Sequence, residues 1–177
     1  LGSPDASNIP KKYPGSGVVY NAICSKAVPE LVEKWGGRAF RSKVGFVNIK
    51  KFMMRNEARI GGEVSAHYNF KDNFYSDSGF IAFLIMLEFL SMEKKKLSDI
   101  SDEVTLYAKN DEINLKVNNA SAIFKEIEKK YSDGKQDFLD GITVVYPNFW
   151  FNVRPSNTEP LLRVTLEADN KEILKTQ

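Results

Sequence analysis

The stretch that decides the fold lies near the C-terminus, at residues 154–164: Arg-Pro-Ser-Asn-Thr-Glu-Pro-Leu-Leu-Arg-Val. Pro155 and Pro160 each hold φ near −65° and remove a backbone donor, which favours a shaped loop. Apolar residues precede the loop at Phe149–Phe151 and follow it from Leu161 onward. The stretch therefore predicts two neighbouring strands that are joined by a polar loop.

This loop concentrates hydrogen-bond donors of the kind that bind phosphate. A guanidinium fork can bind two oxygens of a phosphate dianion at once, and hydroxyl, amide and backbone N–H groups can reach the others. An ordinary hairpin, whose Ser, Asn and Thr side chains bond to their own backbone, is the alternative interpretation. The side chains in question belong to Arg154, Ser156, Asn157 and Thr158.

A second polar loop lies upstream, where Gly61-Gly62 precedes Glu63-Val64-Ser65-Ala66-His67. Glu63 and Ser65 are two residues apart, so both side chains can point to one side of an extended loop, with His67 two residues further on. A carboxylate next to a hydroxyl suits neighbouring sugar hydroxyls, which both donate and accept. A plain glycine turn with a structural histidine is the alternative. One His and one Glu are too few ligands for a zinc or iron site.

Composition excludes several classes of protein. The net charge of +2, with Lys and Arg scattered among acidic residues, gives no reason to expect a nucleic-acid partner. The single Cys24 excludes an internal disulfide and fits a reducing, cytoplasmic location. The chain begins with Leu and shows no signal peptide or membrane-spanning segment, so we expect a piece of a longer soluble protein.

Two domains are expected, after a flexible lead-in at residues 1–17. The apolar run at Val18–Tyr20 is typical of a strand inside a parallel sheet, and the pattern that ends at Trp35 is helical. Residues 18–94 therefore predict an α/β layer domain with a mixed, mostly parallel sheet that is incomplete at its N-terminus. Residues 80–90 are apolar almost all round, which predicts a buried helix, with Asp77 as a possible cap.

Residues 95–177 predict a small α+β domain with an antiparallel sheet. Residues 112–117 alternate between polar and apolar side chains, as in a half-buried strand, and residues 142–146 form a further apolar strand. Residues 123–131 have the spacing of an amphipathic helix that covers the sheet. The polar stretch from Ser91 to Asp102 is the expected hinge between the domains.

Both loops resemble motifs of the α-D-phosphohexomutases, the family of phosphomannomutase and phosphoglucomutase. Residues 154–164 resemble the phosphate-binding loop of its last domain, and Gly62–His67 resembles its sugar-specificity loop, G-E-x-S-[GA]-H. Asp77-Ser78-Gly79 is similar to the D-[DS]-G motif that follows that loop. The resemblance runs from about Val18 to the C-terminus. It implies part of domain three followed by domain four, whose fold is similar to that of the TATA-binding protein.

The resemblance implies binding roles for both loops. Sugar binding would fall to Glu63, Ser65 and His67. Phosphate binding would fall to Arg154, Ser156, Asn157, Thr158 and Arg163. For Arg163 a structural role is equally open. The implied substrates are the 1- and 6-phosphates of mannose or glucose. With Ala66 at the [GA] position of the motif, this loop is similar to that of bacterial phosphomannomutases. The alternatives are a non-catalytic phosphosugar-binding module and a protein-interaction domain.

The family's catalytic machinery has no counterpart in this chain. The phosphorylated serine loop and the D-x-D-x-D-R loop that holds magnesium are both missing, so the chain contains no catalytic residue and no metal ligands. Many relatives carry His where Phe46 stands here. The resemblance implies a parent enzyme that uses a phosphoserine, magnesium and a sugar bisphosphate activator. Its N-terminal domains would be the missing partners of this chain, which alone should be inactive.

Overall fold

The computed structural model describes residues 14–117, 119–156 and 159–177, and the chain forms two compact units, Leu1–Leu106 and Tyr107–Gln177. The division follows Leu106, whereas the sequence suggested a boundary after residue 94. The polar stretch expected as a hinge instead contains helix α5 (Leu97–Val104), which buries Ile100.

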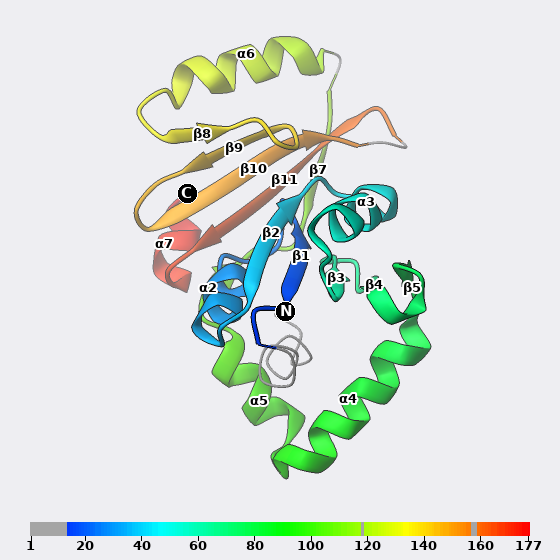
Figure 1. Ribbon diagram of the computed structural model, residues 1–177. Helices are drawn as coiled ribbons and strands as arrows, with labels where there is room; N and C mark the ends of the chain where they lie inside the picture. The colour runs from blue at the N-terminus through cyan, green and yellow to red at the C-terminus, as the bar shows by residue number, and fades with distance from the viewer. Residues whose placement is uncertain (1–13, 118, 157–158) are drawn as a thin grey trace. The chain divides into compact units, whose positions relative to one another are not determined.

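The first unit is built on a five-stranded mixed sheet in the order β2-β1-β3-β4-β5 (Figure 1). The pairs β1–β2 and β1–β3 are parallel, and the pairs β3–β4 and β4–β5 are antiparallel, which confirms a mixed sheet. The strands are β1 (Gly17–Asn21), β2 (Arg38–Ser42), β3 (Ile60–Gly62), β4 (Tyr68–Phe70) and β5 (Ser76–Asp77).

Helices pack on both faces of this sheet because neighbouring residues of β1 point to opposite sides. Val18 belongs to one cluster, with Val32 of helix α2 (Ala27–Lys34). Val19 belongs to another, with Ile49 and Met53 of helix α3 (Phe46–Asn56). A short 3₁₀ turn, η1 (Lys71–Asn73), follows β4. The predicted α/β layer domain is therefore confirmed.

Helix α4 (Gly79–Glu93) departs from expectation in two respects. Ser78, not Asp77, caps it, by accepting the Ile81 N–H at 3.2 Å. The helix was expected to be buried, and this was wrong: Phe89 is its buried residue, whereas Phe80 is 72% exposed. A helix that lies on a sheet contacts it along one stripe, here through Ile81, Ala82 and Ile85. Apolar side chains on its other side, such as Phe83 and Leu84, therefore stay exposed.

The second unit is an antiparallel sheet in the order β6-β11-β10-β9-β8, and β7 also pairs with β11. Helix α6 (Ala120–Lys130) packs its apolar stripe on one face, over Val144, Phe151 and Leu162. The short helix α7 (Lys171–Thr176) follows the last strand. The strands are β6 (Ala108–Lys109), β7 (Ile113–Lys116), β8 (Lys135–Asp137), β9 (Ile142–Val145), β10 (Phe149–Pro155) and β11 (Leu161–Ala168). The expected antiparallel sheet with a covering helix is confirmed.

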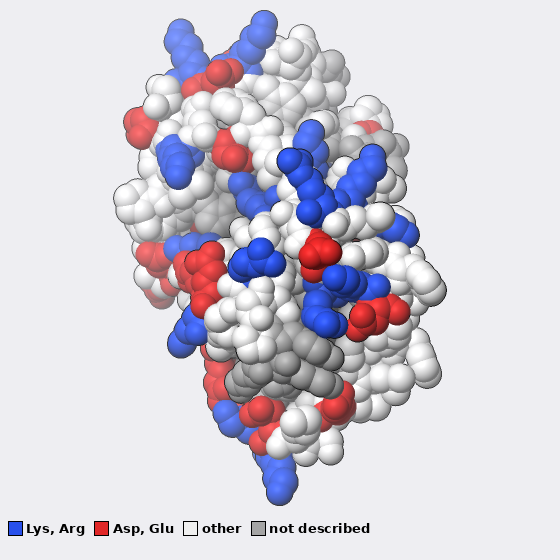
Figure 2. All heavy atoms as spheres, viewed as in Figure 1, with Lys and Arg blue, Asp and Glu red and all other residues white. Residues whose placement is uncertain are grey.

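Charges are mixed over the surface that Figure 2 shows, where Lys and Arg side chains lie among Asp and Glu side chains. This intermixing agrees with the small net charge of +2. Within the described ranges, no helix combines the length and the apolar character that crossing a lipid bilayer requires.

Candidate functional site

The loop that the sequence predicts to bind phosphate is the connection between β10 and β11, as the two flanking apolar runs predicted. Arg154 lies directly opposite Arg163 in the ladder, and the Ser156 N–H donates to the Leu161 carbonyl at 2.9 Å, which closes the hairpin. The hairpin thus brings Arg154, Ser156 and Arg163 to one end of the sheet. Asn157 and Thr158 lie outside the described residues.

An acidic residue that the sequence interpretation missed connects the two arginines. Arg154 Nη2 donates to Glu112 Oε2 at 2.7 Å, and Arg163 Nη1 donates to Glu112 Oε1 at 2.9 Å. A longer ion pair, at 3.9 Å, joins Arg163 to Glu159. In the sequence, Glu112 is visible only as an acidic residue at the start of the expected strand at residues 112–117. Its two arginine partners lie more than forty positions away.

Arg154 is held in a buried environment, with a residue exposure of 5%. Its Nε atom and that of Arg163 are buried and make no hydrogen bond with any described residue. An unpaired buried N–H costs about 1–3 kcal/mol, so the way these two arginines are held is itself a cost to the fold. The two guanidinium groups and the Glu112 carboxylate carry one positive charge in sum, which the more distant and more exposed Glu159 carboxylate offsets.

The loop that the sequence predicts to bind a sugar connects β3 and β4, which form a hairpin. The Glu63 N–H donates to the His67 carbonyl at 3.1 Å, and the Ala66 N–H donates to the Glu63 carbonyl at 3.0 Å. Ala66 adopts a left-handed conformation with φ of 63°, which is uncommon for a residue with a Cβ. A tight turn therefore presents residues 64–66 at the surface.

Glu63 is anchored to the body of the first unit. Its side chain is buried, and its Oε1 accepts the Gly45 N–H at 2.7 Å and the Asn21 Nδ2–H at 3.4 Å. Gly45 is the N-cap of α3, so the carboxylate lies where the helix dipole favours negative charge. The structure thus gives Glu63 a structural role that sequence analysis did not anticipate.

Ser65 and His67 form a pair of their own. Ser65 Oγ lies 2.9 Å from His67 Nδ1, and both residues are exposed. The Glu63 carboxylate is bonded to Gly45 and Asn21 instead, so the three predicted sugar-binding residues share one hairpin but their side chains do not form one hydrogen-bond network.

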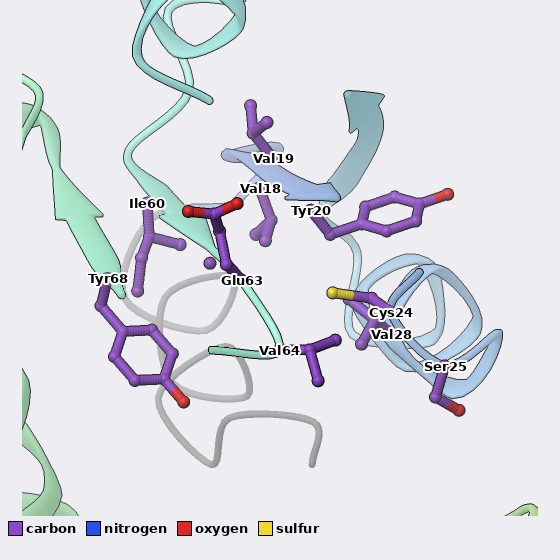
Figure 3. Close-up of a pocket in the computed structure, with 11 residues that line it drawn as sticks. Val18, Val19, Tyr20, Cys24, Ser25, Val28, Ile60, Glu63, Val64 and Tyr68 are labelled. Carbon is purple, nitrogen blue, oxygen red and sulfur yellow. The ribbon is translucent and has the colours of Figure 1, made fainter. Parts of the chain in front are cut away.

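A small apolar cavity lies beside this hairpin (Figure 3). Ile60 and Tyr68 lie on one side of it and Cys24 on the other, while the Glu63 carboxylate points away from Val64. Its volume is about 40 Å³.

Metal ligands do not gather anywhere in the described part of the chain. There, no group of three or more His, Cys, Asp or Glu side chains is arranged to hold a metal ion. The residues at both loops are instead suited to hydrogen bonding with hydroxyl groups and anions.

Comparison with known proteins assigns both units. Residues 5–107 match the family model described as phosphoglucomutase/phosphomannomutase alpha/beta/alpha domain III, and residues 112–177 match that of the C-terminal domain. A phosphomannomutase of Methanocaldococcus jannaschii is 42% identical over 170 residues, and one of Escherichia coli is 34% identical over 161 residues. These alignments cover 96% and 89% of this chain, but only 38% and 35% of the two relatives.

The solved structures agree with this assignment. A phosphoglucomutase/phosphomannomutase family protein of Burkholderia thailandensis is 25% identical and superimposes with a TM-score of 0.84, over 99% of this chain and 39% of that one. The matching sequences and the matching fold cover both units. The chain therefore belongs to the phosphoglucomutase/phosphomannomutase family, of which it represents a C-terminal portion, domain III followed by the C-terminal domain.

Proposed function

We propose that this chain is the substrate-holding part of a phosphohexomutase, which interconverts the 6- and 1-phosphates of mannose or glucose. The arginine cluster at the β10–β11 hairpin is the observation that supports this most, because it gathers two guanidinium groups at one end of the sheet. Family membership and relatives named phosphomannomutase support the hexose phosphates as substrates.

The β10–β11 hairpin would hold the phosphate that is not being transferred. Arg154 and Arg163 would supply charge-assisted bonds worth about 1.5–3 kcal/mol each, and Ser156 a neutral one of about 0.5–1.5 kcal/mol. Asn157 and Thr158 complete the proposed set of donors. Donors that are already held in place, as Glu112 holds the two arginines, stabilise an anion without having to reorganise when it binds.

The β3–β4 hairpin would orient the sugar ring. Both hydrogen bonds of the Glu63 carboxylate end on Oε1, so Oε2 is available to accept a sugar hydroxyl. The Ser65–His67 pair offers a second donor and acceptor at the surface. A carboxylate locked by the backbone of Gly45 has little freedom left to lose on binding, which favours recognition of the sugar.

The proposed reaction explains why these groups stay fixed. A phosphoserine in the parent would donate its phosphoryl group to the free hydroxyl of the sugar phosphate. The resulting sugar bisphosphate would turn around and return its other phosphoryl group to the serine. This chain's hairpins would hold the sugar in both orientations, so the nucleophile need not move.

The remaining chemistry would come from parts of the parent beyond this chain. Magnesium would neutralise charge on the phosphoryl group that moves, and the described residues form no site for it. A sugar bisphosphate would act as the activator. Without the serine, this chain should not turn over hexose phosphates, because positioning groups cannot replace a nucleophile.

An NMR titration of the chain with mannose 1-phosphate tests the proposal. The parent's other domains would supply further contacts to the ligand, so for this chain we expect Kd on the order of 1 mM, which corresponds to about 4 kcal/mol. Arg154→Ala should weaken binding about 10- to 100-fold, and Ser156→Ala only a few-fold. Lys135→Ala, which removes a cation from the distant strand β8, is the matched control. Equal affinities for Arg154→Ala and the wild type would mean that the hairpin is purely structural.

A further inference from the structure

Glu112 bonds to two arginines at once, which sets it apart from a single ion pair on the surface. Each of its two oxygens accepts from a different arginine, at 2.7 Å and 2.9 Å, and its side chain is 26% exposed. The three residues come from three neighbouring strands or their edges, because β11 lies between β7 and β10. One carboxylate therefore links the two arginines at the loop end of the β10–β11 hairpin.

An extra residue in the backbone puts Glu112 on the correct face of the sheet. Lys109 pairs with Glu167 and Ile113 pairs with Val164, so residues 110–112 stand opposite only residues 165–166. One additional residue reverses the alternation of side chains between β6 and β7. As a result Glu112 and Asn114 share the face of Arg163.

The bulge is held by its own hydrogen bonds. Asn110 Oδ1 accepts the Leu166 N–H at 2.6 Å, and the Asn110 N–H donates to the Leu166 carbonyl at 3.0 Å. These bonds replace the ladder contacts that the extra residue interrupts. Bulges are frequent beside functional sites, where they redirect a side chain.

The length of the glutamate side chain also matters. Two strand spacings separate β7 from β10, roughly 10 Å, and the side chains of Glu112 and Arg154 together cross that distance. Aspartate is one methylene shorter and keeps the charge. Glutamine keeps the length but loses the charge and one acceptor oxygen.

We propose that Glu112 is a positioning residue, which holds Arg154 and Arg163 in the arrangement that binds the phosphate. The inference rests on the proposed function, in which these two arginines contact the ligand. The carboxylate occupies one N–H of each guanidinium group and leaves both Nε–H groups without a partner among the described residues. It also compensates the repulsion between two cations at paired positions.

The negative charge of Glu112 has an opposing effect, because it repels a phosphate dianion. We expect positioning to dominate. A guanidinium that must be ordered on binding loses side-chain entropy, and two such groups are involved. The repulsion acts at a partly exposed position, where water and salt reduce it.

Four variants of the chain test this role, with Kd for mannose 1-phosphate and the Nε–H signals of the arginines measured by NMR. Glu112→Ala and Glu112→Asp should both weaken binding about tenfold, and Glu112→Gln should lie between them and the wild type. Asp111→Asn removes the same charge from the neighbouring exposed residue and should change Kd less than twofold. Folded Glu112→Ala protein that binds as tightly as the wild type, or more tightly, would overturn the proposal.

The arginine signals distinguish failure of this inference from failure of the proposed function. In the protein without ligand, Glu112→Ala should shift and broaden the Arg154 and Arg163 Nε–H signals, and Asp111→Asn should not. If these signals are unaffected, Glu112 does not position the arginines. If they respond but the wild type binds no phosphosugar, the proposed function is wrong instead. Should Glu112→Ala fail to fold, Glu112→Gln supplies the same comparison.

Discussion

Arg154 lies directly opposite Arg163 in the antiparallel ladder of β10 and β11. Like charges at paired positions destabilise a sheet, so two arginines placed there require an anion between them. Glu112 supplies one such anion, and a bound phosphate would supply another. The arrangement explains how a loop predicted to bind phosphate can also form a stable hairpin in the absence of ligand.

The geometry of the guanidinium group should matter as well as its charge. Arg154→Lys keeps the positive charge but loses the planar fork that can hold Glu112 and a ligand together. We expect its Kd for mannose 1-phosphate to lie between those of the wild type and Arg154→Ala, and calorimetric titration would measure it. Wild-type affinity in Arg154→Lys would show that charge alone is recognised.

The carboxylate of Glu63 should contribute to stability as well as to binding. Glu63→Ala leaves the Gly45 N–H without its acceptor and should lower the free energy of unfolding of the first unit by about 1–3 kcal/mol. Ser65 is exposed, so Ser65→Ala should change it by less than about 0.5 kcal/mol.

Urea titrations can follow the two units separately, because each contains one of the two tryptophans, Trp35 and Trp150, whose indole N–H signals are distinct by NMR. Glu63→Ala should shift the transition of Trp35. An unchanged Trp35 transition would mean that the Gly45 N–H finds another acceptor.

Gly141 should be intolerant of any side chain. It has φ of +67°, and a Cβ there would overlap the Val153 carbonyl oxygen and lie 2.7 Å from Arg154 Cα. Gly36 has φ of +80° with open space around it, so Gly36→Ala isolates the cost of the backbone conformation, about 1–2 kcal/mol. We predict that Gly141→Ala costs at least about 2 kcal/mol more, measured by urea unfolding. Similar losses for the two variants would show that the strand shifts freely.

Tyr146 should titrate at unusually high pH. Its hydroxyl donates to Asp133 Oδ1 at 2.6 Å, and this bond raises the pKa of the phenol to about 12. Because the folded-state pKa lies above the ordinary value of 10.0, this contribution to stability is complete below pH 10 and is lost as the pH rises towards 12. NMR of ¹³Cζ-labelled tyrosine would detect the titration, and Asp133→Ala should return the pKa towards 10. A Tyr146 signal that titrates near pH 10 in the wild type would contradict the bond.

Local patterns were sufficient to predict most elements of the fold. The spacing of Ile123 and Ile127 placed a covering helix, and both now pack against the core of the second unit. The apolar run at Val18 and Val19 indicated a central parallel strand, because residues on both of its faces are buried. These features follow from periodicities of about 3.6 and 2 residues, which neighbouring residues alone determine.

The remaining features depend on partners that are distant in the sequence. Periodicity does not show which faces of a helix are covered, so the exposed side of α4 was not foreseen. The contact between Glu112 and the arginines requires the pairing of β7 with β11 and the extra residue before it. The anchoring of Glu63 by Gly45 likewise joins two loops that are eighteen positions apart.

The most direct test of the central claim compares ligands with the wild-type chain. Amide signals should be followed by NMR during titrations with mannose 1-phosphate, glucose 1-phosphate and unphosphorylated mannose. We predict millimolar binding of both phosphosugars, with shifts at Arg154, Ser156 and Arg163 that added salt weakens, and no such shifts with mannose. Equal responses to mannose and its phosphate, or shifts confined to residues away from the β10–β11 hairpin, would contradict the assignment of this hairpin as the phosphate site.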